Sequence, residues 1–165
     1  MTTTAKASLI NVALNKPATQ SSMSRWSTPD EAAKAVNGVK SGEHSFHTDY
    51  ELNPWWQVDL GEIYTVASIF IYNRGRKDTP MANRAKSIGA LISCDGVTWE
   101  RILSGGLSFG GALDNSPLSL NCQGKKARYV KLQLEETNYL HLDEVEVLAT
   151  PGKSKIKNPK SRTKH

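Results

Sequence analysis

The sequence predicts an all-β fold, an antiparallel β-sandwich of the jelly-roll type with one short helix, and three observations predict it. The 12 glycines and 7 prolines are spread along the 165 residues and divide the chain into many short segments. Several segments, most clearly residues 128–134, alternate apolar and polar side chains, which is the period of a half-buried strand. Only one helix start is visible. With 38% hydrophobic residues, the chain can bury the core of a single domain.

The expected helix lies near the N-terminus. Thr28-Pro29-Asp30-Glu31 has the sequence of a capping box, with proline at the first helical position. Asn37-Gly38 is typical of a helix end. We therefore expect a helix of one or two turns over Glu31–Val36.

The first well-marked strand, residues 53–61, contains two of the four tryptophans. Pro54 fits only its first position, and Gly61 is expected to end the strand in a turn. Because successive side chains of a strand point to opposite faces, Trp55 and Trp56 should diverge, one of them into the core.

Two further segments extend the expected sandwich. Residues 66–73 are apolar on both faces, which is typical of a central strand. Residues 88–93 and 98–103 flank Asp95-Gly96, so this part of the chain should form a hairpin, with Trp99 in the core.

The positive charge of the chain is concentrated at its C-terminal end. Six basic residues follow residue 152, and subtracting their charges from the net charge of +5 leaves −1 for residues 1–152. A domain with this charge is not expected to bind nucleic acid. We expect an N-terminal extension (1–9), one domain (10–150) and a basic, disordered tail (151–165). The six basic residues are Lys153, Lys155, Lys157, Lys160, Arg162 and Lys164.

No transmembrane segment is expected, because the sequence has no run of 18 apolar residues. The first ten residues carry one lysine and no apolar stretch, so no secretory signal is expected either. The protein would then be intracellular, or would have lost a signal, or would be part of a larger protein.

No catalytic pattern accompanies the four histidines. The chain lacks the G-x-S-x-G, H-E-x-x-H and C-x-x-C motifs. We therefore expect no enzymatic activity.

A set of motifs along the chain resembles the discoidin, or factor V/VIII type C, family. The resemblance runs from about Asn11 to Ala149 and implies the discoidin-like jelly roll, with binding loops gathered at one end. Its motifs are Asn11-Val12-Ala13, residues 16–22, Ala35-Val36-Asn37-Gly38, residues 53–61, residues 93–99, residues 127–132 and residues 142–147.

The two cysteines depart from the secreted members of that family, which often join their two termini by a disulfide. Neither Cys94 nor Cys122 is near a terminus. Two free thiols are expected, with a bridge between them as the alternative.

One stretch resembles the F-type, or fucose-binding, lectins of the same superfamily. Their motif is a histidine, 26 further residues, Arg-x-Asp and, after four more residues, another basic residue. Here 26 residues separate His47 from Arg74, but Arg76 stands where the aspartate is expected. An insertion would make Asp78 the acid that orients the arginines and Arg84 the second base. Otherwise, Arg76 and Lys77 compete for that role.

This resemblance implies a glycan-binding site at His47, Arg74, Arg84 and Asp78. A planar guanidinium suits adjacent sugar hydroxyls, and an imidazole can donate to a further hydroxyl. Fucose is the leading candidate, ahead of galactose or a similar sugar, because the loop lacks the adjacent cysteines that pack on the sugar in several animal lectins. Tyr72, Tyr50 or Phe46 would supply the apolar surface instead. Trp26 is either a stacking platform or a hydrophobic staple.

The resemblance also implies a structural Ca²⁺ behind the binding loops. The Glu144 carboxylate, the Asp143 carbonyl and Asn37, in place of the usual aspartate, are its expected ligands. Lys34, Val39 and His44 are the candidates for further backbone carbonyls. The alternative is a loop without metal, in which Glu144 accepts hydrogen bonds from backbone amides.

The function expected is thus that of a non-enzymatic carbohydrate-binding domain. The alternative is a protein- or anionic-lipid-binding module, although a domain charge of −1 argues against lipid. An extracellular or cell-surface location follows from the resemblance alone. Single sugar sites are usually weak, so avidity would need an oligomer or attachment to a larger protein.

Overall fold

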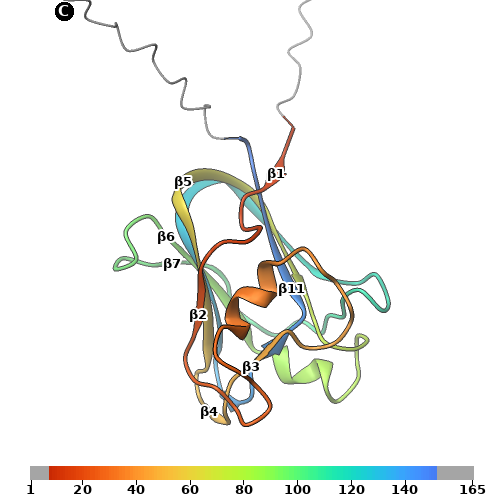
Figure 1. Cartoon of the computed structure of the whole chain (residues 1–165). Coiled ribbons are helices and arrows are strands. Elements are labelled where there is room, and N and C mark those ends of the chain that lie inside the picture. Colours follow the sequence, from red (N-terminus) through yellow and green to blue (C-terminus); the bar gives the residue numbers. More distant parts are fainter. Residues whose placement is uncertain (1–7, 152–165) are drawn as a thin grey trace, which may run out of the picture.

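The computed structural model describes residues 8–151, which fold as an antiparallel β-sandwich (Figure 1). The expected fold class is therefore confirmed. Of the predicted disordered tail only Pro151 is described, and most of the N-terminal extension also lies outside the described residues. No helix among the described residues is long and apolar enough to cross a membrane.

The main sheet has the strand order β1-β11-β5-β8-β6-β7, with β2 paired to β5. These strands span Ile10–Asn11 (β1), Ala18–Gln20 (β2), Trp55–Tyr72 (β5), Ile88–Ser93 (β6), Glu100–Leu103 (β7), Leu118–Leu134 (β8) and Glu144–Ala149 (β11). Four shorter strands form two separate pairs, β3 (Phe46–His47) with β10 (His141–Leu142) and β4 (Glu51–Leu52) with β9 (Thr137–Asn138).

The two longest strands, β5 and β8, build most of the core. The first part of β5 pairs with β2 and its last part with β11, and its register with β8 shifts between Asp59 and Tyr64. Such irregularities bend a strand, which allows β5 to contribute to both layers. Alternate side chains of these strands are buried, as expected: Trp56, Val58, Leu60, Ile69 and Ile71 from β5, and Val130, Leu132 and Leu134 from β8.

Two sequence predictions about this region are wrong. Gly61 does not end a strand in a turn. Instead it lies within β5 at a φ of 86°, next to the register shift, where glycine accepts a conformation that other residues resist. Trp99 is only half-buried, because it lies against the outer face of the sheet, with its ring 6.4 Å from that of Tyr129 and 4.2 Å from Lys131 Nζ.

The expected helix is present as a 3-10 helix, η1, over Glu31–Val36, but the capping box does not form. Asp30 is the N-cap residue and has a φ of 76°, with no side-chain hydrogen bond to the helix. The Thr28 hydroxyl donates to the Glu31 carboxylate rather than to a backbone amide. Because the first helical residue is Glu31, Pro29 lies before the helix. A second 3-10 helix, η2 (Ala82–Ala85), was not predicted.

Several loops meet at one end of the sandwich. In Figure 1, β3 and β4 lie at the end opposite β1 and the two ends of the described chain. Segments far apart in sequence are joined there, since β3 pairs with β10 and β4 with β9. The two cysteines are free, Cys94 exposed and Cys122 buried, as expected.

Candidate functional site

His47 lies at the loop end of the sandwich as part of the short strand β3. Its residue partner across the strand pair is His141 on β10, and only 3% of His47 is exposed. The Nδ1 atom lies 2.8 Å from the carbonyl oxygen of Thr48. Since a carbonyl can only accept, Nδ1 carries the proton and Nε2 of the neutral ring is an acceptor.

The ring of His47 is held neutral by its surroundings. Burial lowers the pKa of His47, the hydrogen bond to the Thr48 carbonyl raises it, and the charges of Arg74 and Arg84 lower it further. Both arginines are therefore close enough to act on this ring. With this tautomer the remaining nitrogen can only accept, so a ligand hydroxyl would donate to the imidazole, whereas the sequence led us to expect the imidazole to donate.

Arg74 lies two residues beyond the end of β5 and is positioned by the buried residue before it, Asn73. The side-chain oxygen of Asn73 accepts from the Arg74 backbone amide at 2.8 Å. The Asn73 side-chain nitrogen donates to the carbonyls of Ala82 and Phe109, at 2.9 and 3.0 Å. Asn73 thus ties the end of β5 to η2 and to the loop before β8. The Arg74 guanidinium itself reaches the sulfur of Met81, 3.5 Å away.

Arg84 enters the same site from η2. Its guanidinium carbon lies 5.1 Å from the ring centroid of Tyr139, within the range of a cation–π contact. The structure therefore brings together three of the four predicted sugar-binding residues: His47, Arg74 and Arg84. Arg76 and Lys77 are exposed.

Asp78, the fourth predicted residue, is not brought to the arginines. Among residues 8–151, no ion pair or side-chain hydrogen bond joins its carboxylate to Arg74 or Arg84. Its contact is through the backbone amide, which donates to the Ser108 hydroxyl at 3.1 Å.

Asp114, which the sequence did not single out, fixes the loop that connects the two arginines. Its carboxylate accepts from the backbone amides of Lys77 at 2.7 Å and of Gly111 at 3.0 Å. The nearby Ser116 side chain and these amide hydrogen bonds lower the pKa of Asp114 to about 2. Asp114 therefore remains an anion that joins the arginine loop to the loop before β8.

Tyr139 is the centre of an aromatic group that surrounds the cluster. Its ring centroid lies 5.2 Å from that of His47, 6.1 Å from Trp26 and 5.2 Å from Tyr50. Trp26 also lies 5.4 Å from His47. Of the apolar surfaces expected beside the sugar, Tyr50 contacts Tyr139 but neither His47 nor the arginines, so it lies outside the cluster itself, whereas Trp26 lies against His47.

The other two expected apolar surfaces are occupied. Phe46 is fully buried and stacks on Trp56. The Tyr72 ring is covered by Lys40 Nζ at 4.7 Å. No motif signalled Tyr139, because it enters the site through the pairing of β9 with β4.

Two further histidines lie beneath His47. His141 is 1% exposed, and neither of its ring nitrogens has a hydrogen-bond partner among the described residues. Burial lowers the pKa of His141 to about 2, and burial also lowers the pKa of His44. The three imidazoles are thus neutral, and the positive charge of the cluster comes from Arg74 and Arg84.

Glu144, the carboxylate expected to bind calcium, has one unpartnered oxygen. Glu144 is fully buried, and its Oε2 atom accepts from the Gly38 amide at 2.5 Å, while Oε1 has no partner among the described residues. Burial raises the pKa of this carboxyl to about 8. A buried oxygen without a partner fits a cation ligand, and the contact with Gly38 also fits the alternative of a loop held by amides.

The neighbouring ligand candidates offer backbone rather than side-chain oxygens. The Asp143 carboxylate accepts from the amides of Ser41 and Gly42, and the Asn37 side-chain oxygen accepts from the amide of Val39. No three His, Cys, Asp or Glu side chains between residues 8 and 151 are arranged to hold a metal ion. A Ca²⁺ here would therefore depend on Glu144 and on main-chain carbonyls.

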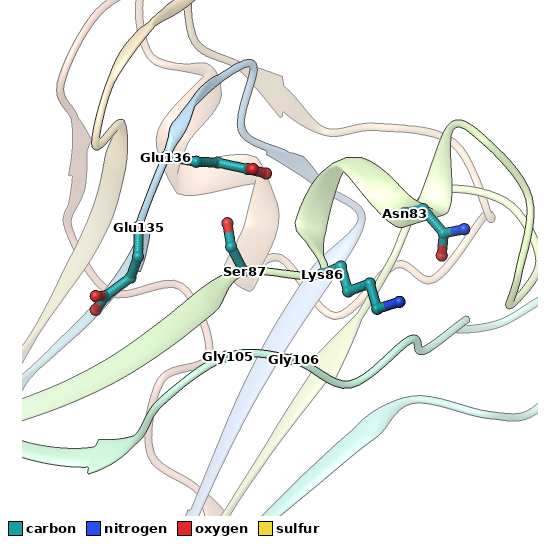
Figure 2. Close-up of a pocket in the computed structure, with 7 residues that line it drawn as sticks. All are labelled: Asn83, Lys86, Ser87, Gly105, Gly106, Glu135 and Glu136. Atoms are coloured by element: carbon teal, nitrogen blue, oxygen red, sulfur yellow. The ribbon is translucent and has the colours of Figure 1, made fainter.

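A cavity beside η2 is lined by residues outside this cluster (Figure 2). It measures about 450 Å³, with Asn83 and Lys86 on one side and Glu135 and Glu136 on the other. Glu135 is already paired with Arg101. None of the predicted site residues lines this cavity.

Comparison with known proteins gives both sequence and structural matches. The family model described as the F5/8 type C domain matches residues 17–145. Fucolectin-5 of Anguilla japonica is 33% identical over 146 residues, which cover 84% of this chain and 76% of the fucolectin. Fucolectin of Anguilla anguilla is 32% identical, covering 83% of this chain and 89% of its own.

Two solved structures are similar to the whole described domain. The lectin domain of lectinolysin complexed with Lewis B antigen is 33% identical, with a TM-score of 0.70, over 86% of this chain and 98% of that domain. A Streptococcus pneumoniae fucose binding module is 28% identical, with a TM-score of 0.67, over 84% of this chain and 97% of the module.

Proposed function

The chain belongs to the F5/8 type C domain family, and from this premise we propose that it binds carbohydrate without catalysis, recognising a terminal fucose or a sugar with similar hydroxyls. The observation that carries the proposal is the convergence of the neutral His47 acceptor with the guanidinium groups of Arg74 and Arg84 at the loop end of the sandwich. An extracellular or cell-surface location is part of the same proposal.

The geometry supports recognition of neighbouring hydroxyl groups. Each guanidinium can donate to ring-hydroxyl oxygens, while a hydroxyl can donate to Nε2 of His47. Asn73 and Asp114 fix the backbone around the arginines before any ligand arrives, and Tyr139 lies under the Arg84 guanidinium. Less conformational freedom is then lost on binding, which favours affinity.

Fucose is the first candidate sugar because similar proteins are named for binding it. Two of them are named fucolectins, and a similar solved structure is described as a fucose binding module. Galactose remains the second candidate, since the arginine loop has no adjacent cysteines to pack on the sugar.

We also propose a structural Ca²⁺ held by Glu144 and by main-chain carbonyls of Lys34, Asn37, Val39, His44 and Asp143. Ca²⁺ prefers oxygen ligands and accepts six to eight of them. When bound, it would hold the loop between η1 and β3 against β11. His47 belongs to β3, so the ion would also help to fix the position of His47. The unpartnered Oε1 atom of Glu144 is the observation that supports this assignment.

Calorimetric titration with methyl glycosides of fucose and galactose tests the binding proposal. We expect Arg74→Ala to weaken binding by about tenfold or more, because each hydrogen bond from a charged group contributes about 1.5–3 kcal/mol. Arg74→Lys should also bind poorly, since it keeps the charge but loses the planar fork.

Arg76→Ala is the matched control in the same loop, because Arg76 is exposed and is not one of the residues of the proposed site. It should bind as the wild type does. Equal binding by the wild type and Arg74→Ala would mean that the sugar binds elsewhere on the sandwich. Binding of neither sugar by the wild type would favour a protein-binding module instead.

A further inference from the structure

Tyr50 extends the aromatic group outward from the His47–Arg84 cluster. Its ring centroid lies 5.2 Å from that of Tyr139, whose own ring contacts His47 and Arg84. Among the ring contacts of the described residues, Tyr50 contacts neither His47 nor Trp26. It therefore lies one ring farther from the arginines than Tyr139 does.

The position of Tyr50 leaves much of its ring uncovered. The residue is 60% exposed, and Leu52, two positions along on β4, is 70% exposed. Two-residue strands hold this surface, since β4 pairs with β9 through Glu51–Asn138 and Leu52–Thr137. The pair of tyrosine rings therefore presents a fixed apolar face that is continuous with the proposed sugar site.

The ionisable residues next to Tyr50 are acidic, while Arg84 lies at the Tyr139 end of this face. Asp49 and Glu51 flank Tyr50 in sequence, and the Glu136 carboxylate accepts from the Asn138 side chain at 3.3 Å. No lysine or arginine from residues 8–151 is paired with these three acids. An anionic group placed beside Tyr50 would therefore be repelled, whereas a neutral sugar would not.

We propose that Tyr50 and Tyr139 form a second subsite, which takes the neutral sugar residue linked to the one held by His47, Arg74 and Arg84. The C–H face of a pyranose ring packs on an aromatic ring, and tyrosine offers that area with little loss of side-chain entropy. The inference rests on the proposed function and narrows it, because the preferred ligand becomes a neutral oligosaccharide rather than a single sugar.

Calorimetry with three probes tests the subsite. The first is the methyl glycoside of fucose or galactose, whichever binds better, and the second is a neutral disaccharide in which that sugar is linked to galactose. The third is the same disaccharide carrying a sulfate on its galactose. The wild type should bind the neutral disaccharide most tightly.

Tyr50→Ala should weaken binding of the neutral disaccharide by about threefold or more, while the monosaccharide affinity stays within about twofold. Tyr50→Phe should bind both as the wild type does, because it keeps the ring. Ile63→Ala, which removes an exposed apolar side chain of β5 outside the cluster, is the matched control for loss of surface area.

Three results would overturn the subsite. They are an unchanged disaccharide affinity in Tyr50→Ala, an equal loss for monosaccharide and disaccharide, and a wild type that binds the sulfated probe as well as the neutral one. Each leaves the monosaccharide site standing. If the wild type binds none of the probes, both the subsite and the proposed function are wrong.

Discussion

At the scale of single residues, the hydrogen bond between His47 and Thr48 determines whether the free nitrogen of the imidazole donates to a ligand or accepts from it. With the proton on Nδ1, the free nitrogen of the ring accepts, so the hydroxyl opposite it must donate. The two arginines donate and cannot accept. The site therefore offers both hydrogen-bond roles, which the hydroxyls of a sugar can use in turn.

Replacement of His47 by glutamine should be less harmful than replacement by alanine. Glutamine still offers a carbonyl oxygen as an acceptor, whereas alanine leaves the ligand hydroxyl unsatisfied, at a cost of about 1–3 kcal/mol. Titration calorimetry should show about a tenfold loss of sugar affinity for His47→Ala and a smaller loss for His47→Gln. Equal losses in the two variants would mean that Nε2 does not accept from the sugar.

At the scale of loops and strands, the acid that holds the arginine loop is Asp114 and not Asp78, which an insertion in the motif would have made the acid. Asp114 acts on the arginine loop through backbone amides and does not contact a guanidinium. Its pKa, lowered from 3.8 to about 2, means that folding stabilises the charged form. That stabilisation is complete above pH 3.8 and is lost as the pH falls toward 2.

Asp114→Asn should accordingly lower the free energy of unfolding at neutral pH by about 1 kcal/mol, with allowance for the partial exposure of the carboxylate. Urea denaturation of both proteins checks this, and the difference between them should shrink between pH 4 and pH 2 as the wild-type carboxylate takes up a proton. Sugar affinity at neutral pH should also fall, because Lys77 is released. A difference in stability that does not change with pH would contradict the role of the charge.

The longer elements could be predicted from the sequence because each carries a periodic pattern. Alternation located the buried side chains of residues 128–134, and the pairing of β6 with β7 confirms the hairpin at Asp95-Gly96. The course of β5 through Gly61 could not be predicted. Its bend depends on a register shift against β8, which is a long-range contact with no local signature.

The site was predictable only in part, for the same reason. His47 and Arg74 were found by a fixed spacing in the sequence. Tyr139 reaches the site through two-residue strands too short to show a period, and the contact of Asp114 with Lys77 joins residues 37 positions apart. The proposed Ca²⁺ ligands are mostly carbonyls, which every residue possesses, so no residue type marks them.

At the scale of the whole molecule, calcium should raise the melting temperature. An ion that binds only the folded state stabilises it by about 2.7 kcal/mol at 100 times its Kd, which is about 5–10 °C for a domain of this size. Differential scanning fluorimetry in excess calcium and in chelator measures the change. Glu144→Gln should abolish it.

Glu146→Gln is the matched control on the same strand, because Glu146 is paired with Lys40. This variant should retain the response to calcium. If the wild type melts at the same temperature in calcium and in chelator, Glu144 serves only the loop amides and the metal assignment is wrong.

The pairing of β1 with β11 has a consequence for how the domain can be displayed. Ile10 lies opposite Ala149 in the register, so the chain enters and leaves the domain side by side, at the end away from β3 and β4 (Figure 1). A partner domain, a linker or a solid support joined on either side of these strands would approach from behind the sugar-facing end. Several copies arrayed in this way would all present their loops outward, toward one glycan-coated surface.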